Sequence, residues 1–208
     1  WLYSGVPAKP VTRVSAAQIA AYHQKVRNEK TKQPDKIGRP IDTLECFVAP
    51  TAQVLGNISV GEGVGIWHGC RLDAGSHNIT VGQGSNIQDN TSLVCETRDI
   101  VIEADVTIGH NVTLFDCTIE SSSLVGIGSI IAAGTVVEND VLVAAGAQTE
   151  PGQRLTSGQV WAGRPARPIG PMDARKRSII EITLPTYRDY AAEFRSAHHL
   201  PLNQLWED

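Results

Sequence analysis

The sequence lacks two features that would place it in a common functional class. It has no cluster of lysine and arginine, and its net charge is −4, so it carries no electrostatic footprint for nucleic acid. It also has no apolar run near the roughly eighteen residues that a membrane-spanning helix needs. We therefore expect a chain that does not bind nucleic acid and does not cross a membrane by itself. A peripheral place on a membrane complex stays compatible with both absences.

Cysteine is also scarce, with four residues in the chain. Cys46, Cys70 and Cys117 share one phase of the repeat described next, and that phase points inward. A buried free thiol behaves as a small hydrophobe. We therefore predict free buried thiols, which favours a reducing compartment.

What the sequence does contain is an aliphatic residue at nearly every sixth position. No member of this series is polar, and a six-residue repeat of this kind is typical of a parallel β-helix, in which each hexad is one short strand and one corner. The series consists of Val48, Val54, Val60, Ile66, Leu72, Val81, Ile87, Leu93, Ile102, Ile108, Leu114, Ile119, Val125, Ile131, Val137 and Val143.

The positions around each aliphatic residue support this interpretation. Two residues before it stands a small or β-branched residue, which suits a narrow inward slot. Three residues after most of them stands a residue that tolerates a positive φ, as a corner requires. These predicted corners are Asn57, Gly63, Gly69, Gly75, Gly84, Asn90, Asp105, Asn111, Gly128, Gly134, Asp140 and Gly146.

The predicted fold is an all-β solenoid with flanking helices. Three hexads make one triangular turn, which gives about five coils of a parallel β-helix. Nine residues separate Leu72 from Val81 and Leu93 from Ile102, so we expect small loops at residues 76–78 and 96–99.

We divide the chain into three parts. Residues 1–40 form an N-terminal extension, with a helix at residues 16–28 after the capping box of Ser15 and Gln18. Residues 41–170 form the β-helix. Residues 171–208 form two helices, 173–182 and 186–199, the second begun by Pro185, and a tail, 201–208, that contacts a partner. An apolar stripe on the second helix packs on the solenoid or on a neighbouring copy.

A short segment near the N-terminus is echoed later in the chain. Residues 5–11, GVPAKPV, match residues 163–169, GRPARPI, and each copy precedes a helical stretch. Two hypotheses stay open. The first copy is the closing segment of a preceding, similar unit, or the likeness of two short Pro-rich segments is chance.

Several ordered motifs together resemble the γ-class carbonic anhydrase family, over about residues 42–195. The resemblance implies a left-handed β-helix that forms trimers. It also implies a metal, usually zinc or iron, held between subunits by three histidines, whose bound water attacks carbon dioxide. The motifs are Phe47-Val48-Ala49-Pro50, Ile66-Trp67-His68-Gly69-Cys70, Asn86-Ile87-Gln88-Asp89-Asn90, Thr107-Ile108-Gly109-His110 and the segment VWAGRPAR at residues 160–167.

The ligand set that the resemblance implies is incomplete. Val94 and Phe115 occupy two of the three ligand positions, and only His110 stands where a ligand should. Neither hydrocarbon side chain can donate to a metal. Cys95 follows Val94, but neighbouring residues on a strand point to opposite faces, so we do not expect it to replace the missing ligand.

The residues that support the family's metal site are changed in part. Its Arg-Gly-Asp triplet reads Asp73-Ala74-Gly75 here. Asn86, Gln88 and Asp89 match the family, in which they lie around the metal. Gln88 and Asp89 either keep such an orienting role or fill a corner by hydrogen bonding.

We therefore expect a catalytically inactive subunit with no catalytic residue and no cofactor bound by this chain alone. The resemblance implies related γ-carbonic-anhydrase-like chains as partners in a heterotrimer, with His110 completing a partner's zinc site. It also implies attachment to the membrane arm of respiratory complex I, on the matrix side of the mitochondrial inner membrane.

Two alternatives stay open. One is a hexapeptide-repeat acyl- or acetyltransferase, with His77 in an excursion loop as the base. The other is an active carbonic anhydrase with relocated ligands.

Overall fold

A computed structural model describes residues 2–4, 9–12 and 46–197. The chain divides into two units, and each is described by itself. The first contains a hairpin of β1 (Leu2–Ser4) and β2 (Lys9–Thr12). The second contains a solenoid and a long helix. The predicted helix at residues 16–28 and the tail at residues 201–208 lie outside the described residues.

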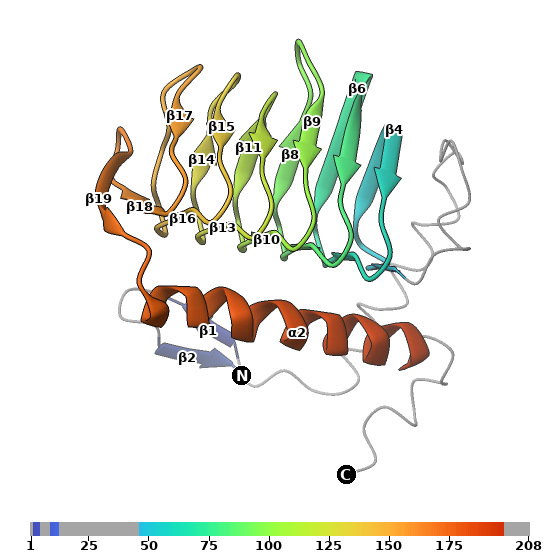
Figure 1. The fold of residues 1–208 in the computed structure, drawn as a ribbon. Coiled ribbons are helices and arrows are strands. Elements are labelled where there is room, and N and C mark those ends of the chain that lie inside the picture. Colours follow the sequence, from blue (N-terminus) through green and yellow to red (C-terminus); the bar gives the residue numbers. More distant parts are fainter. Residues whose placement is uncertain (1, 5–8, 13–45, 198–208) are drawn as a thin grey trace. The chain divides into compact units, whose positions relative to one another are not determined.

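The solenoid has three walls of stacked short strands, as the hexad pattern predicts (Figure 1). Its first wall holds seven parallel strands and is closed by the antiparallel strand β19 (Arg167–Pro171). The parallel strands are β3 (Phe47–Val48), β5 (Gly65–Ile66), β7 (Asn86–Ile87), β10 (Thr107–Ile108), β13 (Leu124–Val125), β16 (Leu142–Val143) and β18 (Gln159–Ala162).

The second and third walls belong to one continuous sheet. Two long strands, β4 (Gln53–Val60) and β6 (Arg71–Val81), run through the corner between them, so that β6 pairs with β8 near its start and with β9 near its end. The second wall then holds β8 (Ser92–Val94), β11 (Thr113–Phe115) and β14 (Ile130–Ile131), and the third holds β9 (Ile100–Ile102), β12 (Thr118–Ile119), β15 (Val136–Val137) and β17 (Arg154–Leu155).

The long strands correct one of the two predicted loops. Residues 76–78 lie inside β6, but residues 74–77 have no partner on β4 and form a bulge opposite Gly56. Residues 96–99 do leave the strands, as predicted. The corner at the bulge is also shifted by one residue. Gly56 takes the positive φ of 87°, and Asn57 does not, because only glycine adopts that conformation freely beside a packed strand. The other predicted corners have positive φ.

The solenoid is longer than predicted. Seven stacked strands on one wall span six turns, whereas the hexads predicted about five. Residues 149–157, beyond the last member of the aliphatic series, contain strand β17, and Leu155 is fully buried. The repeat is hidden in the sequence because Thr149 occupies the aliphatic position. Its hydroxyl is satisfied inside the wall by the amide of Ala132 and the hydroxyl of Thr135.

The aliphatic series forms the core. Its thirteen members from Ile66 to Val143 have exposed fractions of 1% or less. The three earlier members, Val48, Val54 and Val60, are partly buried. They belong to the first coil, which has another coil on one side only among the described residues. All four cysteines are free and buried, which confirms the prediction for Cys46, Cys70 and Cys117.

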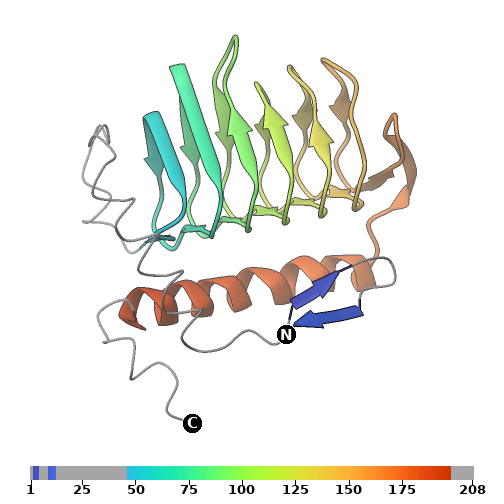
Figure 2. The ribbon, with the colours of Figure 1, turned by 180° about the vertical axis from the view of Figure 1, so that it is seen from behind.

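One helix, α2 (Ala174–Ala197), runs along the first wall (Figures 1 and 2). The prediction of two helices is wrong, because Pro185 lies inside α2. The parts of α2 before and after Pro185 pack on the same wall, and this favours a single continuous helix. Ile180 and Leu184 join a cluster with Val160, and Ala191 joins the main core, as predicted for the stripe. No helix in the described part of the chain is long and apolar enough to span a bilayer.

Candidate functional site

Val94 and Phe115 lie side by side on the second wall. Each is the last residue of its strand, and the two are directly paired between β8 and β11. Asp73 of β6 pairs with Val94 from the other side. Paired residues on adjacent strands are about 4.8 Å apart. The two implied ligand positions are therefore neighbours, and both present hydrocarbon.

Asp73 does not compensate for this loss. Its carboxylate forms an ion pair with the guanidinium of Arg71 and accepts a hydrogen bond from the backbone N–H of Gly75 at 3.2 Å. Both partners lie within two residues of it. The residue that replaces the family's arginine is therefore engaged within its own strand.

His110 lies at the corner after β10, and its ring is one-third exposed. Its Nδ1 is 3.1 Å from Oδ2 of Asp89, and its Nε2 is 3.3 Å from the hydroxyl of Tyr187 on α2. Oδ1 of Asp89 accepts the backbone N–H of His68 at 3.0 Å. If Nδ1 carries the proton toward Asp89, Nε2 keeps its lone pair, which is the tautomer that a metal-binding histidine needs.

Tyr187 is the residue that sequence reasoning missed at this site. The sequence places it in an apolar stripe, and the contact joins residues too far apart in the chain to be read from spacing. Burial raises the pKa of Tyr187, and the charge of Asp89 raises it further. The hydroxyl therefore keeps its proton and can donate to His110.

Asn86 and Gln88 are buried within the first wall. The side-chain amide of Gln88 donates to Oδ1 of Asn86, and the amide of Asn86 donates to the hydroxyl of Thr107, both at 3.1 Å. The first bond stays within one rung, the second joins two neighbouring rungs, and both satisfy polar groups inside the wall. Of the three family-matching residues, Asp89 is the one that contacts His110.

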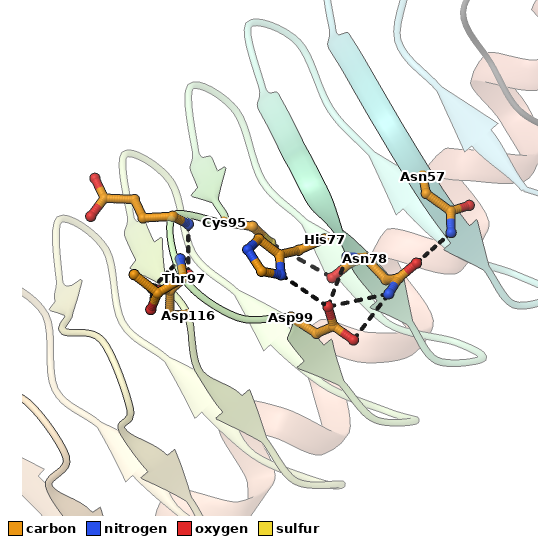
Figure 3. Close-up of polar contacts among 8 residues, drawn as sticks. Asn57, His77, Asn78, Cys95, Thr97, Asp99 and Asp116 are labelled. Carbon is orange, nitrogen blue, oxygen red and sulfur yellow. Dashed lines mark hydrogen bonds and ion pairs between the residues drawn. The ribbon is translucent and has the colours of Figure 1, made fainter.

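Cys95 lies beneath the bend at residues 96–99 (Figure 3). Its Sγ is 3.6 Å from the carbonyl oxygen of Asn78, and burial raises the pKa of its thiol. Asp116 fixes the bend, because its carboxylate accepts the backbone N–H groups of Glu96 and Thr97 at 2.7 and 3.0 Å. Cys95 is thus a neutral thiol tied into the wall.

His77 is not in a loop. It lies in strand β6, and its Nδ1 is 3.8 Å from Asp99 (Figure 3). The same carboxylate accepts the backbone and side-chain N–H groups of Asn78. Within β6, His77 belongs to the bulge between Asp73 and Asn78, the two residues that pair with β4 on either side of it.

A metal needs several donors that converge on one point. Over residues 46–195, whose side chains are described, no group of three or more His, Cys, Asp or Glu side chains could hold a metal ion. With Val94 and Phe115 in two ligand positions, the residues present do not fit the metal that the resemblance implies.

Comparison with known proteins places this geometry in a family. No protein-family model matches the chain. It is 36% identical over 173 residues to γ carbonic anhydrase 1, mitochondrial, of Arabidopsis thaliana. This match covers 80% of this chain and 63% of the Arabidopsis protein. It is 40% identical over 135 residues to γ carbonic anhydrase 2, mitochondrial, of the same plant, and this match covers 62% of this chain and 49% of that protein. The chain belongs to the γ-class carbonic anhydrase family. It spans about half to two-thirds of the length of these relatives.

A solved structure of a hexapeptide transferase family protein from Anaplasma phagocytophilum is 34% identical. The structural match covers 72% of this chain and 89% of the solved chain, with a TM-score of 0.69. The solenoid of this family member is accordingly a left-handed parallel β-helix, the hand that the resemblance implied.

Proposed function

We propose that the chain is a non-catalytic, structural member of a heterotrimer of γ-carbonic-anhydrase-like chains. The observation that carries this proposal is the pairing of Val94 with Phe115. Two adjacent ligand positions have become hydrocarbon, while the buried aliphatic core around them is complete. The chain keeps the buried core of the fold and lacks two donors that a metal site needs.

The proposed location is the matrix side of the mitochondrial inner membrane, as a peripheral subunit on the membrane arm of respiratory complex I. The names of both Arabidopsis relatives support the organelle. The attachment to complex I rests on the resemblance to carbonic-anhydrase-like chains with degraded sites.

In that heterotrimer, His110 would supply the third imidazole of a partner's zinc site. Asp89 already contacts Nδ1, so Nε2 lies on the side of the ring that faces away from Asp89 and is the nitrogen that would bind the metal. The hydroxyl of Tyr187 occupies Nε2 in this chain, and a metal at the interface would have to displace it. One exchanged hydrogen bond is a small cost beside a metal–imidazole bond.

The test is metal analysis and carbon dioxide hydration, measured on the isolated chain and on the purified heterotrimer. We expect neither metal nor turnover from the isolated chain. We expect His110→Ala to lower the zinc content of the heterotrimer, with His77→Ala as the matched control that leaves it unchanged. Zinc bound by copies of this chain alone, or turnover by it alone, would contradict the structural role. Unchanged zinc in His110→Ala would contradict the shared site only.

A further inference from the structure

The hairpin β1–β2 repeats the pairing of the hairpin β18–β19 that closes the solenoid. Each counterpart lies 158 residues further along the chain, as from Tyr3 to Trp161. Both registers shift at the same place, directly before those two residues. The paired residues are Leu2–Thr12, Tyr3–Pro10 and Ser4–Lys9 in the first hairpin, and Val160–Gly170, Trp161–Pro168 and Ala162–Arg167 in the second.

The sequence after the hairpin continues at the same offset. Ser15 corresponds to Asp173, whose carboxylate caps α2 by accepting the backbone N–H of Lys176 at 2.9 Å. Both residue types are strong N-caps. The two residues through which the first half of α2 packs also have apolar counterparts, since Ile180 and Leu184 correspond to Tyr22 and Val26.

In the second copy, strand β18 has two partner strands. One edge of β18 pairs with β19, and the other pairs in parallel with β16, the previous rung of the wall. Trp161 accepts the backbone N–H of Ala144 at 2.8 Å, and its side chain is buried. Strand β18 is thus both the last rung of a solenoid and the first strand of its closing hairpin.

In the first copy, strand β1 has a counterpart of only one of these two partner strands among the described residues. Among the described residues, β1 pairs with β2 alone. A two-stranded hairpin is marginally stable by itself in water, and a bulge at a fixed register is a feature that a surrounding fold specifies. The chance-similarity hypothesis accounts for a Pro-rich motif but not for a shared register and a shared register shift.

We propose that β1 and β2 form the closing hairpin of a second hexapeptide-repeat solenoid, which precedes this one in the same polypeptide. Strand β1 is the last rung of that solenoid, and its free edge pairs in parallel with a strand of two aliphatic residues, as β18 pairs with Leu142 and Val143. One polypeptide then carries two similar prisms. The proposal rests on register and offset and does not depend on the proposed function.

The first test is the native protein, captured from its source with an antibody against α2 and characterised by intact mass and peptide sequencing. We expect one polypeptide heavier than the 22.4 kDa of this chain, with aliphatic residues at every sixth position before residue 1. A native mass near 22.4 kDa, or preceding sequence without hexads, would overturn the proposal.

The second test is hydrogen exchange on the full-length protein and on a chain that begins at residue 1. We expect the amides of Leu2–Ser4 to be protected in the full-length protein like those of residues 160–162, and to lose more than about tenfold of that protection in the shorter chain. Residues 160–162 are the matched control and should not change. Equal exchange of Leu2–Ser4 in both proteins would overturn the docking of β1. Neither readout involves metal or carbon dioxide, so failure here is distinct from failure of the proposed function.

Discussion

At the scale of single residues, the proposed function depends on two neighbouring side chains that cannot bind a metal. A histidine at the end of β8 and another at the end of β11 would lie on one face of neighbouring rungs, because the two positions are directly paired. Valine and phenylalanine fill the same space without a lone pair. The wall keeps its packing while the donors are gone.

Restoring these donors should therefore restore metal binding. We expect Val94→His with Phe115→His to raise zinc affinity by more than about tenfold, or about 1.4 kcal/mol, over the unsubstituted chain. Each single variant should gain far less, since a lone imidazole is a poor zinc site. Isothermal titration with zinc measures the effect, and Val94→Ala with Phe115→Ala is the control for altered packing. A folded double variant that binds zinc no better than the control would show that these are not the ligand positions.

Asp116 is a second residue whose role the structure defines. Its burial would raise the pKa of its carboxyl, but hydrogen bonds from the Thr97 hydroxyl and from the N–H groups of Glu96 and Thr97 outweigh burial and lower it. The carboxylate form therefore stabilises the fold at pH values above the ordinary carboxyl pKa of about 4. That stabilisation is lost as pH falls through the lowered pKa.

We expect Asp116→Asn to reduce the free energy of unfolding by about 1–3 kcal/mol at pH 7, the usual cost of weakening hydrogen bonds to a buried charge. Asparagine tolerates the residue's φ of 43°, so the change isolates the charge. Urea unfolding at pH 7 and at pH 3 measures it, and the gap between variant and unsubstituted chain should narrow at pH 3. Asp99→Asn, at a half-exposed position, is the control. An equal loss at both positions would contradict this account.

At the scale of elements, packing decides where local sequence signals compete. Pro185 favours a helix start, yet α2 continues through it because residues on both sides bury apolar groups on one wall. The chain accepts a missing hydrogen bond to the carbonyl of Glu181 in exchange for that contact. In the same way, β6 continues past the bulge at residues 74–77 because β4 pairs with it on both sides.

Removing the proline should therefore stabilise α2. We expect Pro185→Ala to raise the free energy of opening of the helix by about 1–2 kcal/mol, the helix-interior cost of proline less the entropy returned to the unfolded chain. Hydrogen exchange of the α2 amides measures this quantity. Asp189→Ala, at an exposed position on the same helix, is the matched control. Faster exchange in Pro185→Ala would show that the proline instead holds the two halves in place.

At the scale of the whole molecule, stability is the sum of stacked coils, each in contact only with its neighbours. Leu114 is fully buried between coils, whereas Val48 lies in the first coil and is partly buried. The same truncation should therefore cost different amounts along the stack.

We expect Leu114→Ala to cost about 3–5 kcal/mol, the range for a large aliphatic side chain in a closed core. Val48→Ala should cost about 1 kcal/mol or less, since it removes less volume from a less enclosed site. Denaturant unfolding followed by circular dichroism measures both. Similar costs at the two positions would indicate that the first coil is as enclosed as the middle of the stack.

The walls and most of the corners were determined by the sequence, because each strand and corner of a solenoid follows from a local repeat of six residues. Of the twelve predicted corner residues, all but Asn57 have a positive φ, and at that corner a bulge moved it to Gly56. The prediction did not include the positive φ of Asp116, Ser122, Gly152 and Gly158. The last coil was not predicted, because a polar residue, Thr149, takes the aliphatic position. Its hydroxyl bonds with groups on other rungs, and the local sequence pattern does not show these contacts.

What only the tertiary structure decided are contacts between distant segments. It placed Asp89 and Tyr187 on the two nitrogens of His110, kept α2 continuous through Pro185, and gave β1–β2 the register of β18–β19. The physical reason is the same in each case. A side chain's partner across the stack is chosen by the packing of coils and helix, and spacing along the chain carries no record of it.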